Sequence, residues 1–527
     1  MCIFADESTG DMEQILYPIG IQNFERLREE GFVYVDKTRQ IYDMARKGRY
    51  YFLSRPRRFG KSLLISTMDA YFSGRCELFK GLALERLEKD WETYPVLHLD
   101  LNTADYTQEN GLYEILNNTL CLWEGRYGAS VLESSPSIRF KNVVERAVET
   151  TGKKVVILID EYDKPLLQTF GKDELQEKYQ SQLKAFYSVL KTQDKYIRFA
   201  FLTGVTKFGK VSIFSDLNNL DDISMDVRYS DICGISEEEL HVYFEQPLHE
   251  MAQAGGCSYE DVCARLKEQY DGYHFESGTV GIYNPFSLLN ALNKKSFKDY
   301  WFETGTPTML VEALKFTDYD LSQLQSNEVD GQVLGSVDGW REDPIPLLYQ
   351  SGYLTIKDYD EEFGIYTLTF PNKEVQEGFT KFLIPHYLPR NGRGNTFAVS
   401  NFVREVRSGK VDAFMMRLQS LFADTDYKVV GRMEKYFQNA LYLVFTMMGF
   451  YTEVERNTSY GCMDVVIKTS DYIYVIECKL DKSAQEALDQ IKAKQYAAPF
   501  AADPRKLYKI GINFSSETRG INEYIIQ

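Results

Sequence analysis

The chain has 527 residues, of which 44% are hydrophobic and 26% are charged, the proportions of an ordinary globular protein rather than a disordered or fibrous one. This length predicts about three domains and excludes a single small fold. With 60 Lys and Arg against 77 Asp and Glu, the net charge is −17. Averaged over the chain, this charge argues against a nucleic-acid-binding protein, because phosphate backbones are bound by clustered cations.

The sequence further predicts a cytoplasmic protein that does not enter a membrane. The longest apolar stretch, residues 440–451, is shorter than the roughly 18 to 20 residues that span a bilayer. The first residues, MCIFADESTGDMEQ, carry acids where a signal peptide carries basic residues and a long apolar run. The eight cysteines are scattered, without a CxxC pair or a Cys/His cluster, which is typical of reduced thiols and offers no zinc site.

A strand, a glycine-containing loop and a helix are predicted in residues 49–72. RYYFL (49–53) is typical of an aromatic strand, SRPRRFGKS (54–62) follows it, and apolar residues then recur at helical spacing. A phosphate-binding loop needs this order, because amides at the helix N-terminus face the anion, a lysine neutralises the outer phosphates and a hydroxyl ligates Mg²⁺. The predicted ATP contacts are Arg57, Arg58, Phe59, Gly60, Lys61, Ser62 and Leu63, with Ser62 also a Mg²⁺ ligand.

The loop departs at one position from the usual pattern, which is GxxxxGK followed by Ser or Thr. Arg55 stands where that pattern has its first glycine. Taken alone, GKS is also compatible with a polar helix cap, since such a tripeptide arises by chance in chains of this size. The interpretation therefore depends on a partner motif downstream.

KKVVILIDEYD (153–163) supplies that partner motif. Five successive apolar residues predict a strand buried on both faces, and Asp160 and Glu161 follow at its C-terminal end, where open α/β sheets bind ligands. In a nucleotide hydrolase the first carboxylate holds the Mg²⁺ shell and the second polarises the attacking water. A capped strand end would account for one acid but has no need for two. The two motifs together therefore predict nucleotide binding.

Two further strands, 95–101 and 196–202, complete the predicted α/β core. Thr203 follows the second of them and is predicted to contact the γ-phosphate, with ordinary strand capping as the alternative. Lys207, Lys210 and Arg228 lie just beyond, where an ATPase could use a cation for the leaving phosphate. A solvated surface is the commoner role of such charges.

Eight segments spread along the chain carry a family resemblance. They are YVDKT (34–38), RPRRFGKS (55–62), ILIDEYDKP (157–165), SDLNNLDDIS (215–224), YDGYHF (270–275), YNPFS (283–287), WFETGTPT (301–308) and LLYQSGYLT (347–355). Together they resemble the bacterial AAA-ATPase-like family with a C-terminal nuclease domain. In that family RPRRFGKS is the usual loop, so Arg55 is a family trait. The resemblance implies an α/β P-loop AAA-type ATPase core followed by a helical lid and a winged-helix-like segment.

The middle of the chain, residues 231–388, alternates amphipathic helical windows with aromatic-rich turns. The four histidines in this region, His241, His249, His274 and His386, include no pair at metal-ligand spacing, and we interpret them as structural. PRNGRGNT (389–396) then predicts a linker. The next predicted helix, RMEKYFQNALYLVFTMMGF (432–450), has a buried stripe that begins at Glu434.

Two predicted strands follow, flanking Ser470-Asp471. If these two residues form a tight hairpin turn, Asp464 lies directly across from Glu477. Strand alternation then places Glu477 and Lys479 on one side of the sheet and Cys478 on the other. Directly opposed carboxylates repel each other unless a cation lies between them, so the pattern predicts a metal site.

Two acids and a lysine in one place suit metal-assisted phosphodiester hydrolysis. Asp464 and Glu477 would hold Mg²⁺ or Mn²⁺, Lys479 would orient the water and stabilise developing charge, and Glu434 would add a ligand or a supporting hydrogen bond. The alternative is a salt-bridged, exposed strand.

The spacing of this Asp and the Glu-x-Lys resembles the PD-(D/E)xK nuclease superfamily. SAQEALDQIKAKQY (483–496) matches the family's Gln490, Ile491 and Tyr496. Members often carry arginine two residues before the metal aspartate, and Cys462 stands there instead, a departure that bears on substrate contact and full activity.

The predicted domains are a P-loop ATPase-like core (1–230), a helical lid and winged-helix-like region (231–388), a linker with helices (389–430) and a small α/β nuclease-like domain (431–527). We expect an ATP-binding and ATP-hydrolysing protein coupled to a Mg²⁺-dependent DNA nuclease, in defence or in a mobile element. The alternative is a nucleotide-dependent switch whose C-terminal domain binds nucleic acid or a protein without cleavage. Homo-oligomer formation is left open.

The charge is unevenly spread along the chain. Residues 479–509 contain seven Lys or Arg against four acids, and the predicted phosphate-binding loop carries Arg55, Arg57, Arg58 and Lys61 within seven residues. The two predicted phosphate sites therefore lie in locally basic segments of an acidic chain.

Overall fold

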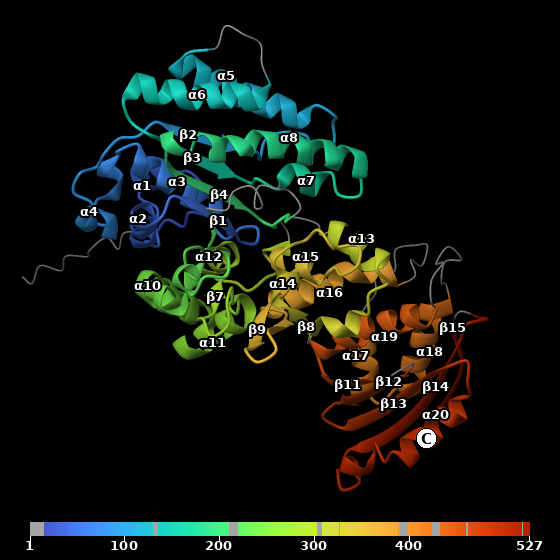
Figure 1. The fold of residues 1–527 in the computed structure, drawn as a ribbon. Helices are drawn as coiled ribbons and strands as arrows, with labels where there is room; N and C mark the ends of the chain where they lie inside the picture. Colours follow the sequence, from blue (N-terminus) through green and yellow to red (C-terminus); the bar gives the residue numbers. More distant parts are fainter. Residues whose placement is uncertain are drawn as a thin grey trace, which may run out of the picture. The chain divides into compact units, whose positions relative to one another are not determined.

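The computed structural model describes residues 15–129, 135–209, 220–302, 308–325, 327–388, 399–423, 433–459, 462–518 and 520–527 (Figure 1). They pack into two compact units. Unit 1 comprises Met1–Trp301, Gly331–Asp338 and Tyr349–Asp358, and unit 2 comprises Phe302–Asp330, Gly339–Leu348 and Tyr359–Gln527. This division is coarser than the three domains and the linker predicted from the sequence. The boundary between the units falls in residues 302–358, where the chain alternates between them.

Unit 1 is built on a five-stranded parallel sheet with the strand order β2-β3-β4-β1-β5. The strands are β1 (Tyr50–Ser54), β2 (Val96–Asp100), β3 (Val155–Asp160), β4 (Ile197–Gly204) and β5 (Asp221–Asp222). Every residue of β3 is buried, as expected for a parallel strand with helices on both faces of its sheet. The four strands expected from apolar runs are thereby confirmed, and their carboxyl ends share one edge.

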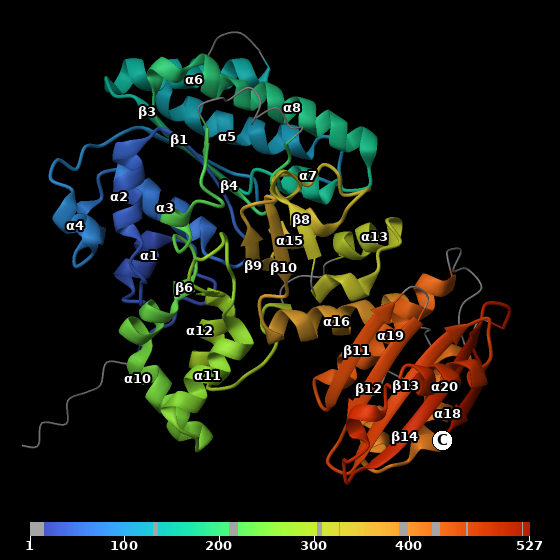
Figure 2. The same cartoon turned by 60° about the horizontal axis from the view of Figure 1, so that its bottom comes forward.

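Helices cover both faces of this sheet, α5, α6 and α8 on one and α1 to α3 on the other (Figures 1 and 2). The helices of this region are α1 (Phe24–Glu29), α2 (Thr38–Lys47), α3 (Lys61–Phe72), α4 (Ala83–Leu87), α5 (Gly111–Tyr127), α6 (Pro136–Thr151), α7 (Lys164–Gln168) and α8 (Asp173–Thr192). This is the α/β architecture of a P-loop ATPase core.

The remainder of unit 1 is mainly helical, as the amphipathic windows predicted. It contains α10 (Glu237–Gly255), α11 (Tyr259–Tyr270), α12 (Pro285–Lys294) and the short strands β6 (Ile235–Ser236) and β7 (Ile282–Tyr283). Capping boxes begin α10 at Ser236 and α11 at Ser258. The helices share an apolar core that includes Leu248, Leu266 and Leu288.

Residues 308–423 add further helices and short strands. They are α13 (Thr308–Phe316), β8 (Asn327–Asp330), α14 (Gly331–Leu334), α15 (Ile345–Gln350), β9 (Thr355–Asp360), β10 (Ile365–Thr369), α16 (Lys373–Tyr387), α17 (Val399–Arg407) and α18 (Val411–Ala423). Within unit 2, β8 pairs antiparallel with β10. The 3-10 helices among the described residues are Cys76–Phe79, Asp194–Tyr196, Val227–Tyr229, Leu321–Gln325 and Ala498–Phe500. The predicted linker, 389–396, lies outside the described residues.

The C-terminal part of unit 2 is a second five-stranded sheet, in the order β11-β12-β13-β14-β15. Its elements are α19 (Met433–Gly449), β11 (Glu453–Ser459), β12 (Cys462–Lys468), β13 (Tyr472–Leu480), α20 (Ala484–Ala493), β14 (Lys506–Ser515) and β15 (Gly520–Ile526). The pair β13–β14, which α20 connects, is parallel, and the other pairs are antiparallel.

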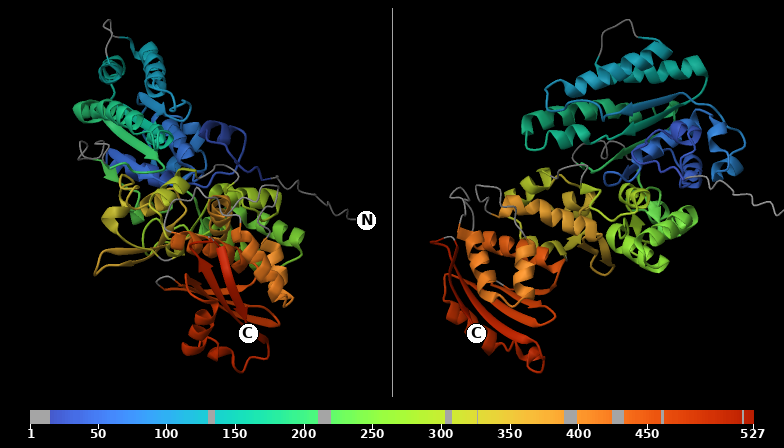
Figure 3. Two further views of the ribbon diagram at one scale, coloured as in Figure 1. Left: turned by 90° about the vertical axis from the view of Figure 1, so that its right-hand side faces the viewer. Right: turned by 180° about the vertical axis from the view of Figure 1, so that it is seen from behind.

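Helices also lie on both faces of the second sheet (Figures 2 and 3). On one face, Leu488 and Ile491 of α20 pack against Ile473 and Val475 of β13. On the opposite face, the Tyr474 hydroxyl donates a 2.7 Å hydrogen bond to a backbone carbonyl of α17. No helix among the described residues is long and apolar enough to cross a membrane.

Candidate functional site

The predicted phosphate-binding loop joins β1 to the N-terminus of α3. Gly60 is the residue before the helix and has a φ of 95°, in the left-handed region that favours glycine. The first amides of α3 have no partner within the helix and therefore face the loop, where they can bind an anion. The expected strand, loop and helix are confirmed.

Lys61 lies between this loop and the acidic end of β3. Its ammonium group is buried and donates hydrogen bonds to the carbonyl oxygens of Arg55, at 3.0 Å, and Pro56, at 3.2 Å. The same nitrogen is 3.7 Å from an oxygen of Glu161. The cation is therefore held at the mouth of the loop, beside the carboxylate expected to activate water.

Asp160 is the last residue of β3 and Glu161 follows it, so both acids lie at the C-terminal end of the strand as predicted. Burial raises the pKa of the Asp160 carboxyl group, and a hydrogen bond from the Ser62 hydroxyl opposes this shift. Glu161 has a φ of 52°, and its amide donates to the Asp160 carboxylate at 2.9 Å. The structure thus brings Lys61, Ser62, Asp160 and Glu161 together. Hydroxyl and carboxylate oxygens are the donors that Mg²⁺ prefers, so Ser62 and Asp160 fit this ion.

The other residues expected to contact ATP divide into two groups. The side chains of Arg57 and Arg58 are exposed, and that of Leu63 is half-buried in the first turn of α3. Phe59 is buried, with its ring centroid 4.8 Å from that of Tyr273 and 5.5 Å from that of Phe275. Its described contacts thus anchor the loop to the YDGYHF segment, and direct contact between its ring and ATP stays a prediction.

Arg55 also acts as an anchor of the loop. Its guanidinium group is buried, donates to the carbonyl oxygens of Ser54, Ser224 and Tyr229, and lies 3.8 Å from the Phe275 ring centroid. Burial lowers the pKa of this group to about 10. Arg55, which stands in place of the usual glycine, therefore holds the start of the loop against residues 224–229.

Thr203 does not join the cluster around Lys61. Its side chain is fully buried and its hydroxyl donates to the carbonyl oxygen of Leu53 at 2.8 Å. This is the strand contact considered as the alternative, and a contact with the γ-phosphate stays a prediction.

Asp163 is a residue that the sequence analysis did not single out. Its carboxylate is fully buried and accepts hydrogen bonds from the amides of Val205 and Thr206 and from the Thr206 hydroxyl. Burial, and then the neighbouring Glu161, raise the pKa of Asp163 to about 6. The signal was the third acid of the DEYD motif, which capping of a strand end does not require.

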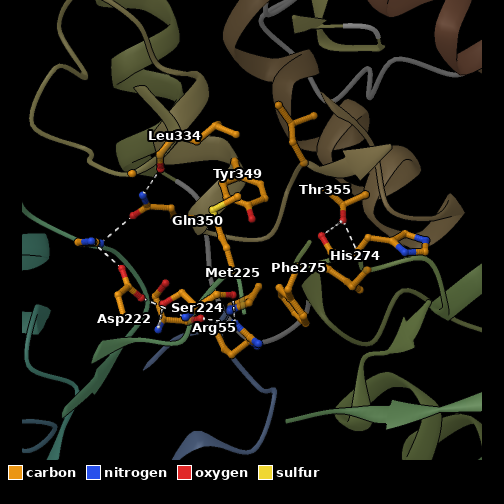
Figure 4. Close-up of a pocket in the computed structure, with 16 residues that line it drawn as sticks. Arg55, Asp222, Ser224, Met225, His274, Phe275, Leu334, Tyr349, Gln350 and Thr355 are labelled. Atoms are coloured by element: carbon orange, nitrogen blue, oxygen red, sulfur yellow. Dashed lines mark hydrogen bonds and ion pairs between the residues drawn. The ribbon is translucent and has the colours of Figure 1, made fainter. Parts of the chain in front are cut away.

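A cavity of about 100 Å³ lies beside the start of the loop (Figure 4). Its lining includes Arg55, Asp222, Phe275 and Gln350, together with Lys207. Lys207 forms a 2.6 Å ion pair with Asp222, so this predicted cation is partly neutralised. Arg228 pairs with Asp226 at the surface, and Lys210 lies outside the described residues.

The second predicted site is in the C-terminal sheet, where β12 and β13 form a hairpin. The strands pair with Asp464 opposite Glu477, which confirms the register expected for a turn at Ser470-Asp471. The side chains of Asp464, Cys462 and Glu434 lie outside the described residues, so their predicted roles stay predictions.

Glu477 and Lys479 lie on the same face of β13, as predicted. An oxygen of Glu477 and the Lys479 ammonium nitrogen are 2.8 Å apart, and the two side chains are 0% and 6% exposed. Cys478 is buried on the opposite face. This pair is not the exposed salt bridge that served as the alternative, because both charges are withdrawn from water.

Strand β14 completes the surroundings of this pair. Gly511 lies opposite Glu477, and Asn513, which is buried, lies opposite Lys479. Asn513 was not predicted, because a lone asparagine in a distant strand gives no pattern. No group of three metal-ligating side chains occurs among those described, which do not include Asp464 and Glu434.

Family models and one relative match this chain. Residues 18–214 match the model of a predicted AAA-ATPase, and residues 432–524 match that of the PD-(D/E)XK nuclease superfamily. An "Uncharacterized protein in vnfD 5'region" from Azotobacter chroococcum mcd 1 is 33% identical over 531 residues, covering 97% of this chain and 98% of the relative. The chain belongs to the predicted AAA-ATPase family with a C-terminal PD-(D/E)XK nuclease domain. In this family member, the first match contains the cluster around Lys61 and the second contains Glu477 and Lys479.

Proposed function

We propose that this protein binds and hydrolyses ATP in unit 1 and cleaves DNA with Mg²⁺ or Mn²⁺ in its C-terminal domain, and that the nucleotide controls the cleavage. The observation that carries the proposal is the buried pair of Glu477 and Lys479 on a strand that sets Asp464 opposite Glu477. Two charges are costly to bury. A catalytic site that needs a carboxylate to bind a metal ion and an ammonium group to bind a phosphate explains why Glu477 and Lys479 are both buried here.

In unit 1, Gly60 and the first amides of α3 cradle the phosphates. Lys61 exchanges its two carbonyl partners for phosphate oxygens, while Ser62 and Asp160 would hold Mg²⁺, which neutralises phosphate charge when bound. Glu161 orients the attacking water and accepts its proton.

In the C-terminal domain, Asp464 and Glu477 would hold the divalent ion, which supplies Lewis-acid activation of the phosphodiester when bound. Lys479 orients the attacking water and stabilises the charge that develops on the phosphate oxygens. Glu434 serves as a further ligand or as a hydrogen-bond partner of one.

A nucleotide-dependent switch that binds DNA or a protein without cleavage is the second candidate. Cys462 favours it, since family members often carry arginine at this position. Divalent-metal titration separates the two functions, because a nuclease site binds Mg²⁺ or Mn²⁺ and loses this binding in Asp464→Asn. A place in defence or in a mobile element stays a prediction.

The test uses the purified full chain with linear, nicked and single-stranded DNA in the presence of Mg²⁺. Cleavage that is lost in Lys479→Ala and Asp464→Ala supports the nuclease site, and cleavage retained in either variant overturns it. Nucleotide affinity is measured separately, and an affinity that is the same in Lys61→Ala as in the wild type overturns the ATP site.

A further inference from the structure

The loop that follows β4, residues 205–209, is tied to the end of the acidic strand. Asp163 accepts hydrogen bonds from two amides and one hydroxyl of this loop, at 2.6 to 3.2 Å. The Tyr162 hydroxyl donates to the Thr206 carbonyl at 2.8 Å. Gly204 accommodates the contact, because a Cβ there would lie 2.3 Å from an Asp163 oxygen. Since Tyr162 and Asp163 directly follow Glu161, a backbone shift at Glu161 is passed to the loop.

The opposite side of the same loop is held by Gln350. The Gln350 side-chain oxygen accepts from the Lys207 amide at 2.7 Å, and its nitrogen donates to the Leu334 carbonyl at 2.7 Å (Figure 4). The Val337 amide also donates to the Lys207 carbonyl at 3.1 Å. The Gly209 amide donates to the Ser336 hydroxyl at 3.2 Å. The loop after β4 is therefore joined to residues 331–338 both through the buried Gln350 side chain and by direct hydrogen bonds.

Residues 350–353 also contact the phosphate-binding loop. Gly352 has a φ of 87°, and a Cβ there would lie 2.5 Å from Cβ of Pro56, so the backbone packs directly on this residue. The Tyr353 ring packs on Trp301 at 4.9 Å, and the Trp301 indole donates to the Arg57 carbonyl at 3.2 Å. A single short segment thus contacts both structures that flank the nucleotide site.

The space beside these contacts permits rearrangement. Arg55, Lys207 and Gln350 line the cavity of about 100 Å³. Close-packed interiors resist displacement of side chains, whereas a void lets neighbouring groups change partners without a steric clash. The Gln350 side chain therefore lies where it can give up its hydrogen bonds to Lys207 and Leu334 and move into the cavity.

We propose that Gln350 is a positioning residue that transmits the nucleotide state from the loop after β4 to residues 331–338 and 349–358. This inference rests on the proposed ATP site. Phosphate binding draws Lys61 away from the carbonyls of Arg55 and Pro56 and so shifts Pro56, on whose ring Gly352 packs. It also repositions Glu161, and this movement reaches the loop after β4 through Asp163. Both receiving segments are continuous along the chain with unit 2. The hydrogen bonds of Gln350 thus form a regulatory connection. A shift between their formed and broken states would change the conformation both of the loop after β4 and of residues 331–338.

Hydrogen exchange of the full chain, with and without a non-hydrolysable ATP analogue and Mg²⁺, tests this link. In the wild type we expect the nucleotide to change protection in the phosphate-binding loop, in residues 205–209 and in residues 331–338. In Gln350→Ala the change in the phosphate-binding loop persists, while that in residues 331–338 is reduced to the part that the direct hydrogen bonds of Val337 and Gly209 transmit. Gln176→Ala is the matched control, because Gln176 also donates to a backbone carbonyl, of Leu166 at 3.1 Å, and it is expected to respond as the wild type does.

Gln350→Glu separates the two hydrogen bonds. Glutamate keeps an acceptor for the Lys207 amide but loses the donor to Leu334. Residues 205–209 should therefore respond as in the wild type, and residues 331–338 should respond less. A full response of residues 331–338 in Gln350→Ala would overturn the inference and leave the ATP site standing. No protection of the phosphate-binding loop in the wild type would instead overturn the ATP site and the inference that rests on it.

Discussion

Glu477 and Lys479 place two opposite charges out of water on one strand. A buried ion pair gains little stability over an apolar pair of similar volume, because desolvation offsets the Coulomb attraction. Stability therefore does not explain why this strand carries the pair. Binding of a divalent cation and a phosphodiester does explain the pair, because the cation needs an oxygen ligand, Glu477, and the phosphodiester needs a positive charge, Lys479.

Glu477→Gln tests this explanation through folding stability. Ligands that bind only the folded state stabilise it by mass action, by about 2.7 kcal/mol when the free ligand is at 100 times its Kd. We expect Mg²⁺ to raise the Tm of the C-terminal domain in the wild type and not in Glu477→Gln. The exposed Glu517 provides the control, since Glu517→Gln should keep the response. An equal rise in wild type and Glu477→Gln would show that the ion binds elsewhere.

Asp163 gives the ATPase-like domain a pH dependence. Its pKa is about 6 in the folded chain against an ordinary value of 3.8, so the folded state binds this proton more tightly than the unfolded state does. Stability from this group is fully present below pH 3.8 and is lost as the pH rises through 6. The free energy of unfolding of the wild type relative to Asp163→Asn should therefore decrease from pH 4 to pH 6, as measured by denaturant titration. A difference that stays constant or increases would contradict the assignment.

At the scale of elements, the contact between α20 and β14 depends on a glycine. A Cβ on Gly511 would lie 2.2 Å from the carbonyl oxygen of Ala484 and 3.0 Å from the amide nitrogen of Leu488. Both are backbone atoms and cannot rotate away. The absence of a side chain at this position is what allows the helix to lie against the sheet beside Glu477.

Gly511→Ala should therefore destabilise the C-terminal domain by at least the 1–3 kcal/mol typical of overpacking. Gly449→Ala is the matched control, because the atom closest to its Cβ would be 3.9 Å away and Gly449 ends a helix. This control should change stability by less than about 0.5 kcal/mol. Chemical denaturation followed by far-UV circular dichroism measures both, and an unchanged midpoint for Gly511→Ala would contradict the close packing.

The elements and the hairpin register could be predicted because they follow from local patterns. A two-residue turn at Ser470-Asp471 leaves one pairing, and that pairing fixes Asp464 opposite Glu477. The partner of Thr203 could not be predicted, since Leu53 is 150 residues away in the chain. The same holds for the contact of Phe59 with Tyr273 and for the hydrogen bonds that Asp163 accepts. Long-range side-chain contacts depend on tertiary packing, which no short pattern encodes.

At the scale of the whole molecule, an acidic chain with a net charge of −17 is proposed to bind DNA. Residues 479–509 carry seven Lys or Arg against four acids, so the attraction is confined to one segment beside the proposed nuclease site. Binding through a few phosphates releases few counterions and is opposed by the rest of the surface charge.

DNA affinity should therefore fall as salt is added, but with a shallow slope, because the slope is proportional to the number of phosphates contacted and this number is small. Fluorescence anisotropy with a labelled duplex in Ca²⁺, over a series of salt concentrations, measures this slope. Lys492→Gln and Lys494→Gln should each reduce it. An affinity that does not depend on salt would contradict a phosphate-binding surface in this segment.

The central claim is that nucleotide bound in unit 1 controls DNA cleavage by the C-terminal domain. The most direct measurement is the cleavage rate of the full chain in Mg²⁺, with and without saturating ATP, for the wild type, Lys61→Ala and Glu477→Gln. We predict that ATP changes the wild-type rate by about 5-fold or more, the lower range of allosteric coupling. Lys61→Ala should cleave at its nucleotide-free rate in both conditions, and Glu477→Gln should cleave in neither. A wild-type rate that is the same with and without bound ATP would contradict the claim.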